Sequence, residues 1–256
     1  MKVLILGDTH GEWAALNFLV GKALNEHPDI SHIIQVGDFG YAWPGTKPFK
    51  FSRSYFADEQ LDYLASIPKW WLDGNHENYN KLLQDSGASQ PGWEWMPRGK
   101  VMEVDGYRMM FFGGATSHDK ASRIEGHSWW PEESISYAQV MNSLGADHSR
   151  IDAIFSHEHP TSIPYSDNRY SKENITGKSD KDALQALREK YDPKFWFFGH
   201  HHRGDSKMEG DMLWTCCPIV DDGKPPCYTI WTGETVDRYW SRERRKDERK
   251  RKPFIT

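Results

Sequence analysis

Short apolar runs alternate along the chain with turn-forming stretches rich in Gly, Asp, Asn and His. Such runs, four to six residues long and rich in β-branched and aromatic side chains, predict buried strands. Six of them read KVLIL, SHIIQV, KWWLD, YRMMFF, DAIF and FWFF, and they are followed by GDTHG, GDFGY, GNHEN, GGATSHDK, SHEHP and GHHHR. Helix-like periodicity covers about residues 12–25, 54–66 and 180–191. Strands alternating with helices predict an α/β fold.

Two later segments, TCCPIV and PCYTIWT, also have the composition of strands. We expect them to form an antiparallel pair that completes a second sheet. No linker interrupts the pattern, which predicts one domain over residues 1–240. Residues 241–256 then form a basic C-terminal tail, which contains RERRKDERKRK (242–252).

The charge of the chain is unevenly distributed. The formal net charge is -5, whereas the segment 242–252 carries eight basic and three acidic residues, a local +5, so the remainder carries -10 (-5 minus +5). An acidic body is a poor general binder of nucleic acid, although the tail leaves such binding open. Apolar runs of strand length, an N-terminus without an export signal and three cysteines without a C-x-x-C pair predict a cytoplasmic protein without a membrane span.

Five of the six strand-end loops contain side chains that ligate metals. In α/β sheets, ligands bind in the crevice at the carboxyl ends of the strands. Carboxylate and amide oxygens mixed with imidazoles suit Mn, Fe, Zn, Co or Mg, and the lack of a thiolate argues against a structural zinc site. The candidates, in chain order, are Asp8, His10, Asp38, Asn75, His76, His157, His159 and His200 to His202.

The ordered set GDTHG, GDFG, GNHE, SHEHP and GHHH resembles the calcineurin-like metallophosphoesterases over about residues 1–235. The resemblance implies a sandwich of two mixed β-sheets flanked by α-helices, with two divalent metal ions in the crevice. Mn²⁺ is the favoured ion, and Fe, Zn, Co and Mg are alternatives. Carried over by motif position, one metal is held by Asp8, His10 and His202, the other by Asn75, His157 and His200, while Asp38 bridges both, His76 is the uncoordinated catalytic histidine and His201 points away.

Such a constellation predicts attack on a phosphate ester by a metal-bridging hydroxide, in line with the leaving group. His76 would act as general acid or as a positive charge on the phosphoryl oxygens. One departure concerns the second motif, which the protein phosphatases of this family extend to GDxxDRG. Tyr41 stands at the position of their second Asp and no Arg follows, which argues against a protein phosphatase.

The segment 113–133, GGATSHDKASRIEGHSWWPEE, is similar to one in small bacterial and phage phosphoesterases. Lys120 and Arg123 within it are candidate phosphate contacts. The alternative is an ordered surface loop in which Trp129 and Trp130 pack against the fold.

These features together predict a phosphomonoesterase or phosphodiesterase that acts on a small phosphorylated or nucleotide-like substrate. One alternative is a metal-dependent nuclease, which the basic tail favours and the acidic body disfavours. Another is a non-catalytic interaction scaffold on the same fold. Scaffolds of that kind lose ligands or the catalytic histidine, whereas every ligand position is present in this chain.

Overall fold

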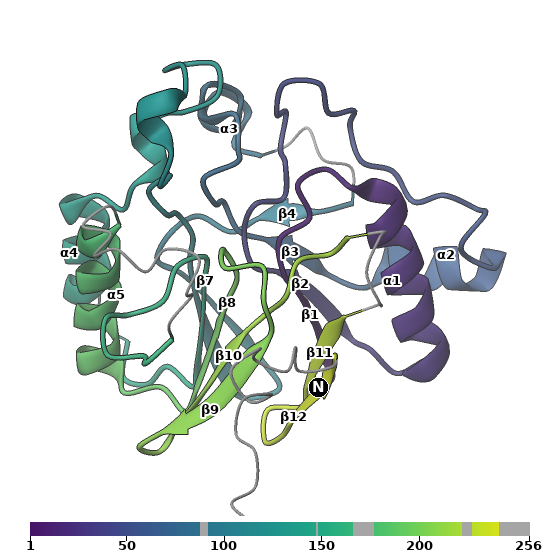
Figure 1. Ribbon diagram of the computed structural model, residues 1–256. Helices are drawn as coiled ribbons and strands as arrows, with labels where there is room; N and C mark the ends of the chain where they lie inside the picture. The colour runs from purple at the N-terminus through teal and green to yellow at the C-terminus, as the bar shows by residue number, and fades with distance from the viewer. Residues whose placement is uncertain (88–91, 147, 166–176, 222–226, 241–256) are drawn as a thin grey trace, which may run out of the picture.

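The computed structural model describes residues 1–87, 92–146, 148–165, 177–221 and 227–240 (Figure 1). Its strands form two six-stranded mixed sheets. The first has the order β12-β11-β1-β2-β3-β4 and the second the order β5-β6-β7-β8-β10-β9. Strands β1 to β4 run parallel to one another in the first sheet, as do β6, β7, β8 and β10 in the second. Antiparallel strands complete both sheets: β11 and β12 extend the first from β1, while β5 and β9 flank the parallel strands of the second.

The bounds of the elements are as follows. The first sheet comprises β1 (Val3–Leu6), β2 (His32–Gln35), β3 (Lys69–Trp71), β4 (Glu94–Trp95), β11 (Tyr228–Trp231) and β12 (Val236–Tyr239). The second comprises β5 (Lys100–Val104), β6 (Tyr107–Phe112), β7 (Ala153–Ser156), β8 (Phe195–Phe198), β9 (Asp205–Glu209) and β10 (Met212–Cys216). The helices are α1 (Trp13–Glu26), α2 (Asp58–Ser66), α3 (Tyr79–Asp85), α4 (Tyr137–Gly145) and α5 (Lys178–Tyr191), with 3-10 turns at Lys120–Ser122 and Pro131–Glu133.

The alternation of side chains along β1 builds the layers. Val3 and Ile5 point to one face and pack with Phe111 and other residues of the second sheet, so the two sheets meet face to face. Leu4 and Leu6 point to the other face, where they pack with residues of α1. Apolar positions of α4 and α5 cover the outer face of the second sheet in the same way (Figure 1). All four residues of β1 are fully buried, which explains why the strand reads as a continuous apolar run.

The predicted sandwich of two mixed sheets flanked by helices is confirmed, and the six predicted early strands are all present. The predicted pairing of the two late segments is wrong. Residues Met212–Cys216 run parallel to β8, whereas Tyr228–Trp231 run antiparallel to β1 in the other sheet. Local composition indicates a strand, but its partner is decided by which buried surface each side chain fills. Trp214 packs outside the second sheet and Trp231 between the sheets.

None of the described helices is long and apolar enough to traverse a lipid bilayer. The tail predicted over residues 241–256 lies outside the described residues, so the domain division stays a prediction.

Candidate metal centre

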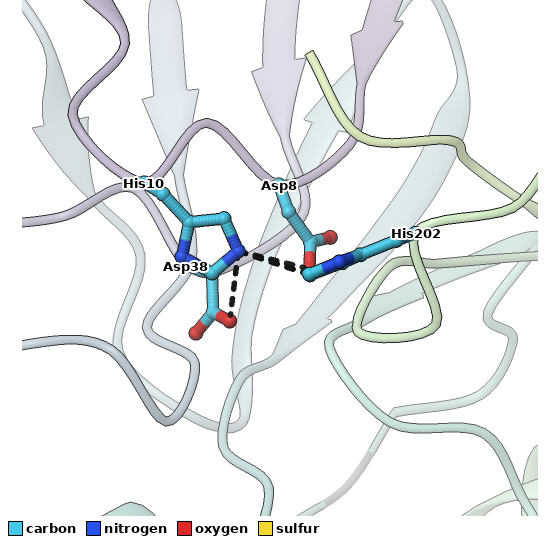
Figure 2. A group of neighbouring side chains, drawn as sticks. All are labelled: Asp8, His10, Asp38 and His202. Carbon is cyan, nitrogen blue, oxygen red and sulfur yellow. Dashed lines mark hydrogen bonds and ion pairs between the residues drawn. The ribbon is translucent and has the colours of Figure 1, made fainter. Parts of the chain in front are cut away.

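Side chains from five loops converge at the carboxyl ends of β1, β2, β3, β7 and β8. Two groups of donors have their ligand atoms within 4.8 Å of one another. One group consists of Asp8, His10, Asp38 and His202 (Figure 2), and the other of Asp38, His157 and His200. Asp38 belongs to both groups.

The two carboxylate oxygens of Asp38 face different groups. Its Oδ2 lies 3.7 Å from His10 Nε2, and its Oδ1 lies 3.3 Å from His157 Nε2. In the first group, His202 Nε2 lies 3.1 Å from Asp8 Oδ2 and 3.0 Å from His10 Nε2. Burial alone would raise the pKa of Asp38, but the facing rings of His157 and His76 outweigh it and hold the pKa well below the usual range. An ionised, shared carboxylate is what a bridging ligand requires.

His157 illustrates how the protein orients a donor. Its Nδ1 lies 2.8 Å from the carbonyl oxygen of Val36, to which it donates, so Nε2 is directed at Asp38. Burial lowers the pKa of His157, yet the carboxylates of Asp38 and Asp8 overcome this effect and raise it to about 10. The two carboxylates therefore favour positive charge at this position, and a bound divalent cation would supply that charge.

Asn75 presents a buried oxygen to the site. Among the described residues, its Oδ1 accepts no hydrogen bond, whereas its Nδ2 donates to Ser117 Oγ at 3.2 Å. Ser117 is held in turn by Glu133, which accepts from the Ser117 backbone N–H at 2.6 Å and from its hydroxyl at 3.0 Å. This chain of hydrogen bonds fixes which end of the amide faces the site. An unpaired buried oxygen costs free energy, and a metal ion is a suitable partner for it.

Backbone conformations of low intrinsic stability concentrate at the same place. The left-handed region is entered by His10, Asp38, His200 and His202, with φ of 46°, 53°, 65° and 60°. Residues other than glycine have a strained backbone in this region, and such strain is typical of functional sites. Two neighbouring glycines are needed for space: a Cβ on Gly74 would lie 2.2 Å from Asp38 Oδ1, and one on Gly199 would lie 2.4 Å from Asp8 Oδ1.

His76 lies beside the two groups. Its backbone N–H donates to Asp38 Oδ1 at 2.8 Å, and its Nδ1 lies 2.9 Å from Asp38 Oδ2. Its ring centroid is 4.9 Å from that of Trp43. Tyr41, at the position where protein phosphatases have their second Asp, is fully buried and directs its hydroxyl to Asp85 at 2.6 Å instead.

The family model for the calcineurin-like phosphoesterases matches residues 1–204, the segment that supplies all of these side chains. The chain belongs to the calcineurin-like phosphoesterase family. No curated protein matches its sequence.

Solved structures share the fold at low sequence identity. TT1561 of Thermus thermophilus has a TM-score of 0.60 and 12% identity, over 93% of this chain and 97% of that one. A candidate 5'-nucleotidase of Staphylococcus aureus, solved with alpha-ketoglutarate, has a TM-score of 0.53 and 14% identity. That match covers 90% of this chain and 50% of the other.

On this family scaffold, the loop after β6 passes over the site. Arg123 Nη2 lies 3.0 Å from His76 Nε2, and Arg123 Nε forms an ion pair with Asp119 at 2.7 Å. An arginine can only donate, so His76 Nε2 accepts and Nδ1 carries the proton toward Asp38. The group that contacts His76 in place of the missing second Asp is therefore an arginine, and it comes from a distant loop.

The other predicted residues of this loop lie farther from the centre. Lys120 is exposed, with its Nζ 5.8 Å from the ring centroid of Trp129, so its phosphate contact stays a prediction. Trp130 is buried against Trp43, as the ordered-loop alternative expects. His118, which the sequence did not single out, brings its Nε2 to 3.1 Å from His200 Nε2.

Three further polar residues were not anticipated from sequence. Ser117 and Glu133 hold Asn75, and Glu158 accepts from His201 Nε2 at 2.9 Å. The last contact agrees with the prediction that His201 points away from the other two histidines of its triplet. The sequence indicated them only by position: Glu158 lies between the candidate ligands His157 and His159, and Ser117 and Glu133 lie within the segment 113–133.

Proposed function

We propose that this protein is a dinuclear-metal-dependent phosphoesterase that hydrolyses phosphomonoesters or phosphodiesters. The observation that carries the proposal is the position of Asp38, whose two oxygens face separate donor groups while His76 lies against it. A shared carboxylate flanked by two imidazole-containing groups is suited to two divalent ions a few ångströms apart.

The residues present fit such a pair of ions. Asp8, His10 and His202 would hold one, Asn75, His157 and His200 the other, and Asp38 both. The unpaired oxygen of Asn75 supports this assignment, as does the direction of His157 Nε2. Mixed oxygen and imidazole donors favour Mn²⁺, with Fe, Zn, Co or Mg as alternatives. When bound, two such ions supply a hydroxide nucleophile and neutralise charge on the phosphoryl oxygens.

The side chains of the protein would then handle the proton and the substrate. His76 carries its Nδ1 proton against Asp38, and its Nε2 faces Arg123. When a phosphate ester draws the Arg123 guanidinium onto its oxygens, His76 Nε2 is released and takes up a proton from solvent, while the Nδ1 proton stays against Asp38. The Nε2–H of this imidazolium can then protonate the leaving alkoxide as general acid. Trp43, which is partly exposed and packs against His76, offers aromatic surface beside the site, which suits a small nucleotide-like or aryl substrate.

The test is hydrolysis of an aryl phosphodiester and an aryl phosphomonoester by the full chain. We expect activity that chelation abolishes and Mn²⁺ restores. A panel extended to cyclic nucleotides and DNA separates a small-molecule esterase from a nuclease. A protein that binds no transition metal and stays inert with every divalent ion would support the scaffold instead.

A further inference from the structure

A third group of metal-binding side chains lies outside the two described above. Glu158, His159 and His201 have one donor atom each within 4.8 Å of one another. All three are buried, with 1%, 3% and 4% of their surfaces exposed. They come from the loops after β7 and β8, whose other side chains include His157 and His200.

His159 directs an unpaired nitrogen into this group. Its Nδ1 lies 2.9 Å from the carbonyl oxygen of Pro160, to which it donates, so Nε2 carries a lone pair. Within the part of the chain that the structure describes, that Nε2 is buried without a hydrogen-bond partner, and it lies 3.7 Å from Glu158 Oε1. A buried acceptor without a donor is destabilising, so the cluster as it stands lacks one positively charged or proton-bearing partner.

The spacing of the donors suits a small cation. Around a tetrahedral ion with ligand distances of about 2.0–2.1 Å, neighbouring donor atoms lie about 3.4 Å apart. Glu158 Oε1 lies 2.9 Å from His201 Nε2 and 3.7 Å from His159 Nε2, one separation slightly below and one slightly above that value. All three donor atoms lie within 4.8 Å of one another, so a small ion between them would require only small movements of the side chains.

We propose that Glu158, His159 and His201 bind a third divalent ion, for which Zn²⁺ is the best match. Two imidazoles and one carboxylate are a common zinc donor set and leave one position for a further ligand. Binding replaces the Nε2 proton that His201 shares with Glu158, and that proton leaves to solvent. Lys181, whose Nζ lies 3.9 Å from Glu158 Oε2 and whose side chain is 27% exposed, turns outward as the ion adds its charge.

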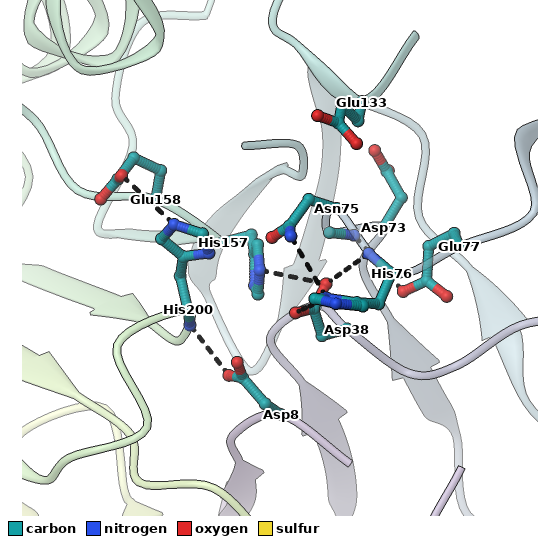
Figure 3. Close-up of polar contacts among 12 residues, drawn as sticks. Asp8, Asp38, Asp73, Asn75, His76, Glu77, Glu133, His157, Glu158 and His200 are labelled. Carbon is teal, nitrogen blue, oxygen red and sulfur yellow. Dashed lines mark hydrogen bonds and ion pairs between the residues drawn. The ribbon is translucent and has the colours of Figure 1, made fainter. Parts of the chain in front are cut away.

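The role of this ion is to brace the catalytic centre. It ties the loop after β7 to the loop after β8, and each loop carries one predicted ligand of the dinuclear pair. Glu158 Oε2 also lies 3.8 Å from His200 Nε2 (Figure 3), so the carboxylate faces both sites. An ion that binds only the folded state stabilises it by mass action.

The experiment is zinc stoichiometry of the full chain after chelation, reconstitution with Zn²⁺ and dialysis. We expect three zinc ions per chain in the natural protein and two in His159→Gln. The matched control is His127→Gln, which changes an exposed histidine and should retain three. Anomalous diffraction at the zinc edge should show a peak between Glu158, His159 and His201, and this measurement decides the matter if the variant does not fold.

The outcomes separate this site from the proposed function. Two ions in both the natural protein and His159→Gln, with no anomalous peak at the cluster, overturn the third site and leave the dinuclear centre standing. Three ions retained in His159→Gln also overturn it. A single ion that His159→Gln removes supports the third site and contradicts the dinuclear centre.

Discussion

Ser117→Ala tests whether the loop after β6 positions a metal ligand. The substitution removes the hydroxyl that accepts from Asn75 Nδ2 at 3.2 Å and donates to Glu133 at 3.0 Å. One such hydrogen bond contributes about 0.5–1.5 kcal/mol. Without it the Asn75 amide can also turn its nitrogen toward the metal. If only half of the molecules then present the amide oxygen, metal binding weakens by about a further twofold. The sum is about 1–2 kcal/mol, or about 5- to 30-fold weaker binding at the Asn75 site.

The assay is calorimetric titration of the chelator-treated protein with Mn²⁺ at about pH 8. Burial raises the pKa of Glu133 to about 7, so its carboxylate is ionised under these conditions. Asn75→Ala identifies which class of binding site depends on the amide. Glu133→Gln should weaken the same class, because an NH₂ group cannot accept from Ser117, and Glu132→Gln, at an exposed neighbouring position, should have no effect.

A double variant provides the decisive comparison. If Ser117 and Glu133 act as one unit on Asn75, the combined substitution weakens binding no more than either substitution alone. Effects that simply add would show that Glu133 acts by another route. Wild-type affinity in Ser117→Ala would refute the reasoning, since the amide would then be held without the loop.

The remaining predictions concern the reaction centre and the tail. Arg123→Ala should lower kcat/KM by an amount equivalent to about 1.5–3 kcal/mol of transition-state stabilisation, because the lost contact is charge-assisted, and it should leave the metal content unchanged. Lys120→Ala, at an exposed position three residues away, should change kcat/KM far less, and equal effects of the two substitutions would contradict the assignment. His76→Ala should abolish turnover with both metal ions retained; if it empties a metal site instead, the assignment within GNHE is wrong. Asp38→Asn should lose activity together with much of the metal, as metal analysis would show, whereas full retention of both ions would exclude a bridging role. Deletion from Arg242 onward should leave turnover of small substrates nearly unchanged, because charges there are screened over about 8 Å at physiological salt; a large fall in a folded protein would place the tail at the site.

The sequence by itself determined the layered architecture and the list of donors. Each ligand-bearing loop follows a continuous apolar run, because strands buried on both faces of a sandwich have no polar side to display. These strands run parallel within their sheets, so their carboxyl ends lie at one edge, and the order of the motifs was enough to predict that Asp8, Asp38 and His157 meet. Glycines within these motifs, such as Gly74, also mark the site in the sequence, because a larger residue at that position would clash with Asp38.

Only the tertiary structure decided what holds these donors and what lies beside them. The contact between Arg123 and His76 spans 47 residues, and Ser117 reaches Asn75 across 42. Contacts between residues so far apart in the sequence depend on how loops pack against the folded sheet. The composition of one segment therefore does not predict which residue of the other it will contact. The same reason separates the two late strands into different sheets. Tertiary packing also brings Glu158, His159 and His201 together: these neighbours of His157 and His200 point away from the centre and form a buried cluster of their own.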